Sequence, residues 1–319
     1  MNIKENFCRL CKSKNTIVIN VLKHKCFFCN NCRNLFFTPK NRKTIFNYIS
    51  FILKFINRIL RINYLDKILC FKQESPEEAY YYYKSIIENQ KYQNTKWWEY
   101  DEKFIEYLKE NNIDLNNKRI ISISEEPGFI YDKLKKFSNN ILFTALNNEV
   151  SKIMRDKIGV NTITYNANTD DLTKLINEKY DIVLMRWVLG HVNNLDQFIN
   201  TLNKITSNNA VVFCNFQKPS FQLSVVFGYD NYTFSAFYDE KYVESIFNSN
   251  GFEIIKKDTQ IENILKKYYS SILKKILFLP IYGYYYLQHY LKNKIFGKNY
   301  EIPIKETKVT FILKKTIIE

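Results

Sequence analysis

Five short apolar runs, rich in β-branched residues, recur along the 319-residue chain from residue 119 onward. They are "RIISI" (119–123), "ILFTAL" (141–146), "NTITY" (161–165), "DIVLM" (181–185) and "AVVFCNF" (210–216). Runs of this length and composition are typical of parallel strands that are buried on both faces. Helical patterns separate them, so the chain from about Thr95 onward is predicted to form a doubly wound α/β sheet.

Two of the separating segments carry helix signals. "NLDQFINTLNKI" (194–205) repeats apolar residues at the spacing that places them on one helical face. "DEKYVESIFNSNG" (239–251) begins with Asp239, a predicted N-cap, and ends with Gly251, which is predicted to terminate the helix. These signals indicate helices of ordinary globular length between the strands.

A cluster of cysteines lies near the N-terminus. Cys8 and Cys11 form one Cys-x2-Cys pair and Cys29 and Cys32 form a second, with 17 residues between the pairs. Two such pairs are typical of a four-thiolate zinc site, in which two short turns complete a tetrahedron. Cys26 and Cys29 also have the right spacing, but Cys29 and Cys32 are favoured because an apolar strand follows them. Four thiolates leave no position for a substrate, so the predicted Zn²⁺ is structural.

The net charge of +15 is unevenly distributed. Residues 1–40 carry +7, residues 41–72 carry +6 and residues 263–298 carry +7, whereas residues 73–262 carry −6. Basic extensions attract phosphate-rich partners, either an anionic membrane surface or a nucleic acid. The acidic central part argues against nucleic acid, because an RNA-modifying pocket normally lies in a positive funnel.

Neither a secretory signal nor a membrane span is predicted. The first residues lack an apolar signal core. The longest uncharged run, 276–291, has 16 residues and is interrupted by Pro280 and Gly283, whereas a span needs roughly 20 apolar residues. The chain is therefore predicted to be cytoplasmic with reduced cysteines, and Cys70 and Cys214 are expected to be buried as small apolar residues.

Four longer segments follow one another in the order and spacing of a known family. They are "RIISISEEPGFIYDKL", "ILFTALNNEVSKIMRDKIGV", "YDIVLMRWVLGHVNN" and "FSAFYDEKYVESIFNSNGFEII". Together they resemble S-adenosylmethionine-dependent methyltransferases with a Rossmann-like fold. "FCRLC" and "CNNCRNLFFTP" resemble the zinc ribbon that precedes this domain in bacterial methyltransferases acting on sugars and surface glycans. The combined order carries the resemblance, since no single motif is specific.

The resemblance implies a domain organisation. It gives a zinc ribbon at 1–40 and a methyltransferase-like Rossmann domain at 76–319. The basic, apolar residues between them, 41–75, are predicted to form an amphipathic helical linker. The last strand of the sheet would be antiparallel, with "GFEIIKKD" and "KVTFILKK" as an antiparallel pair. A helical insertion at about 260–305 would separate these two strands.

The resemblance also implies that S-adenosylmethionine binds in the loop after the first strand. The family has an acid followed by three alternating glycines in this loop. Aligned on "PG", these positions are Ser122, Ser124, Glu126 and Gly128, so only the last glycine is kept. A side chain at Glu126 stands where backbone must approach the cofactor closely, although Glu125 or Glu126 could supply the missing carboxylate. The loop is therefore degenerate relative to the family.

Two further acids of the family are replaced by amides. The acid that binds the ribose aligns with Asn147, and the acid near the adenine aligns with Asn166. A neutral hydrogen bond contributes roughly 0.5–1.5 kcal/mol, against about 1.5–3 kcal/mol for one to a charged group. Both asparagines are therefore expected to keep the cofactor-binding geometry at reduced strength.

Candidate catalytic and substrate residues follow the fourth and fifth strands. His191 lies where open α/β sheets hold ligands, and a pKa near neutrality would let it accept a proton from a substrate hydroxyl. The alternative is a histidine that caps or packs the loop. Arg186 and Trp187 lie in the same loop and could line the cofactor pocket, and Asp230 and Tyr232 occupy the family's substrate-side region.

Three functions are compatible with these features. The first is an S-adenosylmethionine-dependent methyltransferase with a small-molecule, sugar or surface-glycan acceptor. The second is a catalytically inactive, zinc-containing binding protein with the methyltransferase fold. The third is an RNA methyltransferase, which the charge of −6 in residues 73–262 disfavours.

Two basic segments, 44–71 and 266–294, combine long apolar faces with Lys or Arg and almost no acid. Helices of this kind lie in the interface of anionic membranes, where apolar burial and charge attraction add. They would place the protein at the inner face of the membrane. The alternative is that both segments pack on the body of the protein or on a second subunit.

Overall fold

The computed structural model describes residues 7–8, 11–14, 16–21, 24–29, 31–37, 96–124, 128–146, 148–218, 236–261 and 307–316. The predicted linker (41–75), Cys70 and nearly all of the predicted insertion (260–305) lie outside these residues. Cys214 is buried, as expected. No helix within the described ranges is both long enough and apolar enough to cross a membrane.

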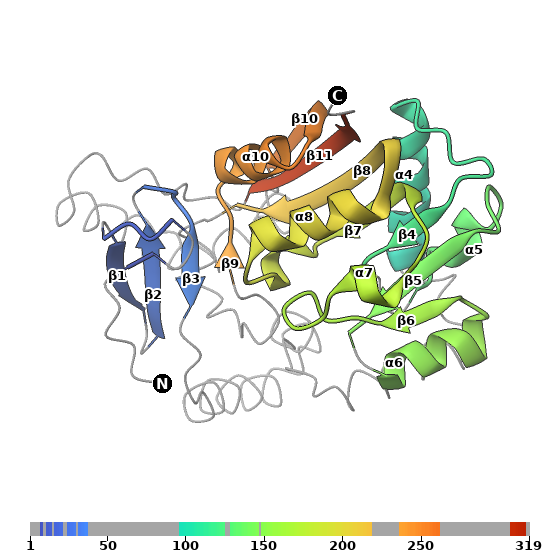
Figure 1. Ribbon diagram of the computed structural model, residues 1–319, viewed down its shortest axis with the longest axis horizontal. Coiled ribbons are helices and arrows are strands. Elements are labelled where there is room, and N and C mark those ends of the chain that lie inside the picture. The colour runs from blue at the N-terminus through green and yellow to red at the C-terminus, as the bar shows by residue number, and fades with distance from the viewer. Residues whose placement is uncertain are drawn as a thin grey trace, which may run out of the picture.

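Seven strands form one large sheet in the order β10-β11-β8-β7-β4-β5-β6 (Figure 1). Their bounds are β4 (Ile120–Ser122), β5 (Ile141–Ala145), β6 (Thr162–Thr164), β7 (Tyr180–Arg186), β8 (Thr206–Gln217), β10 (Phe252–Ile261) and β11 (Thr307–Lys315). The five strands from β8 to β6 pair in parallel, whereas β11 is antiparallel to both β8 and β10. This confirms the predicted Rossmann-like α/β class with an antiparallel last strand.

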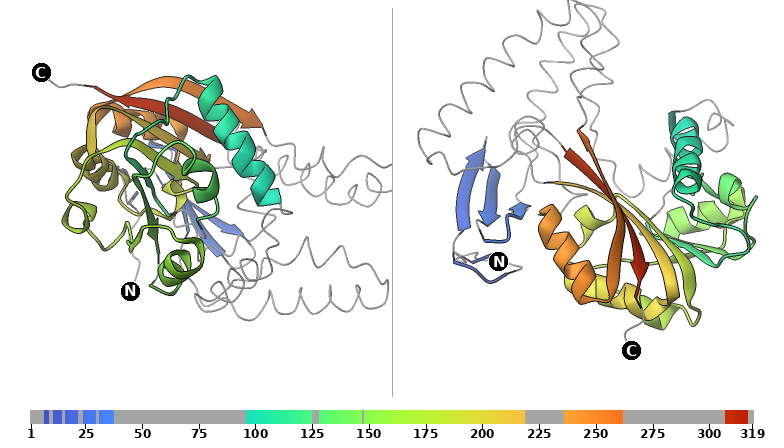
Figure 2. Two further views of the ribbon diagram at one scale, coloured as in Figure 1. Left: turned by 90° about the vertical axis from the view of Figure 1, so that its right-hand side faces the viewer. Right: turned by 90° about the horizontal axis from the view of Figure 1, so that it is seen from above.

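Helices cover both faces of the sheet and complete three layers. The first face carries α4 (Lys96–Glu110), α5 (Tyr131–Leu134) and α6 (Asn148–Ile153), which continues into a π-helical turn (Met154–Ile158). The second face carries α7 (Leu172–Leu175), α8 (Leu195–Ile205) and α10 (Glu240–Ser249). Figure 2 shows α4 on the side of the sheet opposite to α8 and α10. Each face has its own apolar core, as strands buried on both sides require.

The residues predicted to begin and end helix α10 do so, and α8 begins with a side-chain cap of the same kind. The Asn194 side chain accepts a hydrogen bond from the amide of Gln197 at the start of α8. The Asp239 side chain accepts one from the amide of Lys241 at the start of α10. Gly251 follows α10 with a φ of 77°, in the left-handed region that a residue without Cβ adopts without strain.

The cysteine-rich segment forms a second, four-stranded sheet in the order β1-β2-β3-β9. Three strands come from the N-terminus: β1 (Thr16–Val21), β2 (His24–Cys29) and β3 (Leu35–Phe37). The fourth, β9 (Ala236–Phe237), comes from the chain between β8 and α10 and pairs antiparallel with β3. Figure 1 shows β9 between the blue N-terminal strands and the large sheet. The N-terminal sheet is therefore completed by a strand from the α/β part of the chain.

Candidate metal centre and cofactor crevice

The four predicted metal ligands are brought together. The sulfur atoms of Cys8, Cys11, Cys29 and Cys32 all lie within 4.8 Å of one another. The Sγ atoms of Cys8 and Cys32 are 3.5 Å apart, and those of Cys11 and Cys29 are 3.4 Å apart. A tetrahedral zinc with Zn–S bonds near 2.3 Å places its sulfurs about 3.8 Å apart. The four thiols therefore fit a tetrahedral metal ion. The backbone of Cys26 lies within β2, and its side chain is outside the described part of the chain.

The two cysteine turns share a left-handed residue directly after the second cysteine. Lys12 and Arg33, each directly after the second cysteine of a pair, have φ values of 58° and 57°. In the first turn the amide of Lys12 donates to the carbonyl of Cys8 over 3.0 Å. Residues with a Cβ enter this left-handed region at an energetic penalty, so the two turns require support from the sulfur cluster or from the surrounding contacts.

The candidate cofactor crevice lies where the strand order reverses. Strand β4 has β5 on one side and β7 on the other, so the chain leaves β4 and β7 in opposite directions across the sheet. In doubly wound sheets ligands bind at this switch point, outside the carboxyl ends of the strands. Three groups of predicted residues follow these ends: the loop after β4, the loop after β6 and the loop after β7.

The loop after β4 has a backbone typical of glycine at two of its described positions, only one of which is a glycine. Ser124 has a φ of 52° and Gly128 a φ of 84°. The amide of Ser124 donates to Thr144 Oγ1 over 2.9 Å, which fixes the turn against β5. Ser122 is fully buried, and its hydroxyl has no hydrogen-bond partner among the described residues. A polar ligand that reached the carboxyl end of β4 could supply the missing partner, and the predicted contact of Ser122 with the cofactor stays a prediction.

Three predicted residues of the crevice lie outside the described ranges: Glu125, Glu126 and Asn147. The substrate-side candidates Asp230 and Tyr232 also lie outside them. Their roles stay predictions.

Asn166 lies after β6, as predicted, but much of its polar capacity is used within its own loop. Its backbone amide donates to Asp170 Oδ2 over 2.8 Å. Its side-chain oxygen accepts from the amide of Asn168 over 3.0 Å. A ligand that used this oxygen would compete with the turn, and the predicted contact of Asn166 with the adenine stays a prediction.

Asn168, two residues later, joins the loops after β6 and β7. Its side-chain nitrogen donates to the carbonyl of His191 over 2.7 Å. Its side-chain oxygen accepts from the amide of Asn193 over 2.6 Å. Both ends of one amide therefore hold the backbone around His191.

His191 ends a short 3-10 helix (Leu189–His191) directly after β7. Burial lowers its pKa to about 4, from the value near neutrality that the sequence suggested. The imidazole is therefore neutral at pH 7, which is the state that a general base needs. Its proton affinity is lower than that of an ordinary histidine, so its strength as a base is reduced.

Trp187, at the end of β7, has a strained backbone. Its φ is 65°, which is an outlier for a bulky residue. Its amide donates to Asn215 Oδ1 over 2.7 Å, and Asn215 is itself buried on the neighbouring strand β8. Strain of this kind persists only where the surroundings hold it, and it is concentrated at functional sites.

Arg186, the neighbour of Trp187, forms a buried ion pair. Its Nη1 lies 2.6 Å from Asp101 Oδ1 on α4, and both side chains are less than a tenth exposed. The guanidinium also lies 5.0 Å from the centre of the Phe104 ring, in a cation–π contact. The structure thus places Arg186 in the attachment of α4 to the sheet, while its predicted contact with the cofactor stays a prediction.

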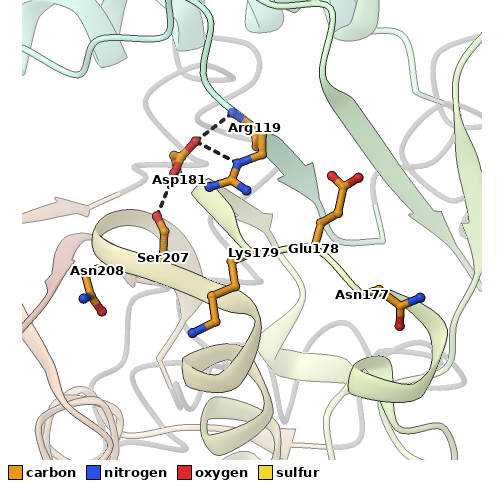
Figure 3. A pocket seen from close by; sticks show the side chains of 7 residues that line it. All are labelled: Arg119, Asn177, Glu178, Lys179, Asp181, Ser207 and Asn208. Carbon is orange, nitrogen blue, oxygen red and sulfur yellow. Dashed lines mark hydrogen bonds and ion pairs between the residues drawn. The ribbon is translucent and has the colours of Figure 1, made fainter.

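An open cleft of about 570 Å³ lies at the opposite edge of the sheet, near the amino ends of β4, β7 and β8. Figure 3 shows Arg119, Asp181 and Ser207 pointing toward one another in it. Asp181 accepts from the Arg119 side chain over 3.3 Å and from the Ser207 hydroxyl over 2.7 Å. These bonds join the starts of three strands and satisfy the carboxylate. Ligands of doubly wound sheets bind at the carboxyl ends of the strands, whereas this cleft lies at their amino ends. We therefore assign its hydrogen-bonded residues a structural role.

Sequence reasoning missed four residues that shape the crevice: Asp101, Asn168, Asn215 and Tyr238. Only Asn168 had a local signal, its position two residues beyond Asn166 in a loop already singled out. The others act through partners far away in the sequence, so no short motif marks them.

No family model and no curated protein matches the chain. Among solved structures, it is similar to an S-adenosylmethionine-dependent methyltransferase from Archaeoglobus fulgidus, with 14% identity over 69% of this chain and 100% of that one (TM-score 0.45). A second, from Mesorhizobium loti, shows 10% identity over 63% and 93% (TM-score 0.43). A cyclopropane synthase from Mycobacterium tuberculosis shows 11% identity over 63% and 79% (TM-score 0.43). These similarities concern the fold alone.

Proposed function

We propose that the chain is an S-adenosylmethionine-dependent methyltransferase that acts on a small molecule, a sugar or a surface glycan. The observation that supports this best is the backbone of the loop after β4. It adopts left-handed conformations at Ser124 and Gly128, both of which align with glycines of the family. Ser124 adopts this conformation despite carrying a side chain. The glycine-like path of the loop is thus retained at these two positions.

The residues at the crevice have distinct tasks in this proposal. The bound cofactor supplies the methyl group. Gly128 lets backbone approach the cofactor, and the buried hydroxyl of Ser122 offers a hydrogen bond to its polar end. The neutral His191 accepts the proton of the acceptor hydroxyl, because its lowered pKa keeps it unprotonated at pH 7.

The four-cysteine cluster is proposed to hold a structural Zn²⁺. The sulfur spacing fits a tetrahedral ion, and four thiolates leave no coordination position for a substrate. The metal therefore stabilises the N-terminal sheet and takes no part in the chemistry.

Calorimetric titration of the full-length protein with S-adenosylmethionine and with its demethylated product tests this function. We expect saturable binding of both, with the product competing for the same site. The absence of heat with either compound, for protein whose metal content and fold are intact, would contradict it.

A second candidate is a binding protein that has lost methyl transfer. Two observations favour it: Glu126 replaces a family glycine, and the side-chain oxygen of Asn166 is already bonded within its loop. In this case the fold would remain while the cofactor affinity is lost. The same titration separates the two candidates.

We further propose that the basic segments 44–71 and 266–294, which lie outside the described residues, bring the protein to an anionic membrane. Such contact would suit a lipid-linked glycan acceptor. Vesicle flotation tests this: association should rise with anionic lipid and fall with salt, because charges are screened within about 10 Å at 0.1 M. Equal recovery with neutral and anionic vesicles would favour packing of these segments on the protein.

A further inference from the structure

A series of contacts leads from the cysteine cluster toward the body of the protein. The amide of Cys29 donates to the carbonyl of Asn34 over 3.0 Å, which closes the second cysteine turn. The Asn34 side chain is fully buried, and its oxygen accepts from the amide of Asp239 over 2.6 Å. Asp239 is the N-cap of α10, so one asparagine joins the turn that contains two predicted metal ligands to the start of a core helix.

Tyr238, which directly precedes Asp239, continues the contacts to the crevice. It is 1% exposed, and its hydroxyl donates a short hydrogen bond to the carbonyl of Val192. Val192 follows His191 directly, and the carbonyl of His191 is held from the other side by Asn168. The backbone around the candidate base is therefore fixed between Tyr238 and Asn168.

The pairing of β3 with β9 supports the same connection. Leu35 lies opposite Phe237 and Phe36 opposite Ala236, so β9 depends on the strand that follows the second cysteine turn. Cys29 and Val192 belong to one continuous apolar core together with Tyr238. A packed core transmits a displacement because it contains few voids that could absorb it.

We propose that the metal-bound N-terminal sheet positions the His191 loop, defined as residues 187–193, with Asn34 and Tyr238 as the positioning residues. Binding of a metal by four thiolates contributes directly to the folding of the segment that supplies them. Loss of the metal releases the turn at Asn34, then β9 and Tyr238, and finally the carbonyl of Val192. The inference rests on the proposed function only in taking His191 as the base. The contacts through Asn34 and Tyr238 do not depend on that role.

Hydrogen exchange of the full-length, Zn²⁺-loaded protein measures this coupling without reference to activity. The amides of His191 and Val192 donate to the carbonyls of Val188 and Leu189, so their exchange reports on the order of the loop. Tyr238→Phe removes one hydrogen bond to the loop. The exchange of the His191 loop should become roughly two- to ten-fold faster, while peptides covering β5 (141–145) stay unchanged.

Tyr242→Phe is the matched control. Its ring stacks on that of Tyr238 with centroids 6.1 Å apart, but no hydrogen bond from its hydroxyl is found within the described ranges. This variant should leave the loop unchanged. Chelation of the metal from the wild type should give the same local acceleration as Tyr238→Phe, and chelation of Tyr238→Phe should add less than it does in the wild type.

Equal loop exchange in Tyr238→Phe and Tyr242→Phe, with metal bound, would overturn the proposal. Acceleration confined to residues 24–37 on chelation of the wild type would also overturn it. If chelation also accelerates amide exchange in 141–145, removal of the metal unfolds the whole chain. The proposal is then decided by the exchange of the His191 loop in metal-loaded Tyr238→Phe and Tyr242→Phe. Cofactor binding, measured separately by calorimetry, can fail while these exchange results stand, so the two proposals fail independently.

Discussion

Arg186 and Asp101 form a buried ion pair across 85 residues of sequence, with 2.6 Å between Nη1 and Oδ1. The pair joins the carboxyl end of β7 to α4, one residue before the strained backbone of Trp187. The crevice edge of β7 is thus held by a helix that precedes the first strand of the sheet.

Removal of the carboxylate should be strongly destabilising. Asp101→Asn leaves the guanidinium buried without its counter-charge, and such a change typically lowers the free energy of unfolding by about 3–5 kcal/mol. Urea unfolding measures it. Asp132→Asn, which removes the carboxylate of the exposed pair with Lys135, is the control and should lower that free energy by less than about 1 kcal/mol. Similar small losses in both variants would contradict a supporting role for the buried pair.

Ser124→Gly should stabilise the protein. The left-handed conformation is unfavourable by about 1–2 kcal/mol for a residue with a Cβ. Against this gain, glycine lowers the free energy of unfolding by about 0.4–1 kcal/mol, because it gives the unfolded chain more conformational entropy. The expected net gain is about 0.5–1 kcal/mol, seen as a higher denaturant midpoint at unchanged slope. The control is Ser245→Gly in α10, which should lower the free energy of unfolding by about 0.5 kcal/mol because glycine is unfavourable inside a helix. A loss at both sites would indicate that Ser124 is not strained.

Substitutions in the cofactor loop should separate the two roles considered for Glu126. Gly128→Val should abolish S-adenosylmethionine binding while the metal content stays intact, because a branched side chain is strained at a φ of 84°. If Glu126 obstructs the loop, Glu126→Gly tightens binding; if Glu126 holds the cofactor's ammonium, the same change weakens it. Calorimetry gives the sign. An unchanged affinity in Gly128→Val would place the cofactor elsewhere.

His191 should make the stability depend on pH. Its folded pKa of about 4 lies below the ordinary value of 6.5, so between these values the unfolded state binds a proton that the folded state does not. Stability is therefore full above about pH 6.5 and falls as the pH drops toward 4, by at most about 3 kcal/mol. His191→Gln should flatten this slope in denaturant unfolding at pH 7 and pH 5. A slope of equal size in the variant would assign the dependence to other groups.

Metal analysis should distinguish the two cysteine sets that the sequence allows. The wild type should contain one zinc per chain. Cys32→Ser should lose it and disorder the N-terminal sheet, because the metal contributes about 10–16 kcal/mol in comparable four-ligand peptides. Cys26→Ser should keep it, because Cys8, Cys11, Cys29 and Cys32 already supply the four ligands of a tetrahedral ion. Retention of zinc in Cys32→Ser but not in Cys26→Ser would reverse the assignment.

The sequence alone determined the features that depend on neighbours in the chain. The apolar runs specified five parallel strands, because a strand buried on both faces must be apolar throughout. Asp239 and Gly251 marked the ends of α10, because caps act within a few residues. The two Cys-x2-Cys pairs indicated the sulfur cluster, since each pair already brings two ligands together locally.

Only the tertiary structure decided the features that depend on distant partners. Arg186 was expected in the cofactor pocket, but its partner Asp101 comes from α4 and became visible only through packing. His191 was expected to titrate near neutrality, but burial by other elements lowers its pKa. The N-terminal sheet is completed by β9, which comes from beyond residue 230. This pairing forms because folding brings β9 beside the edge of β3. Charge pairing, desolvation and strand addition all depend on what surrounds a residue in space, which a local sequence pattern does not encode.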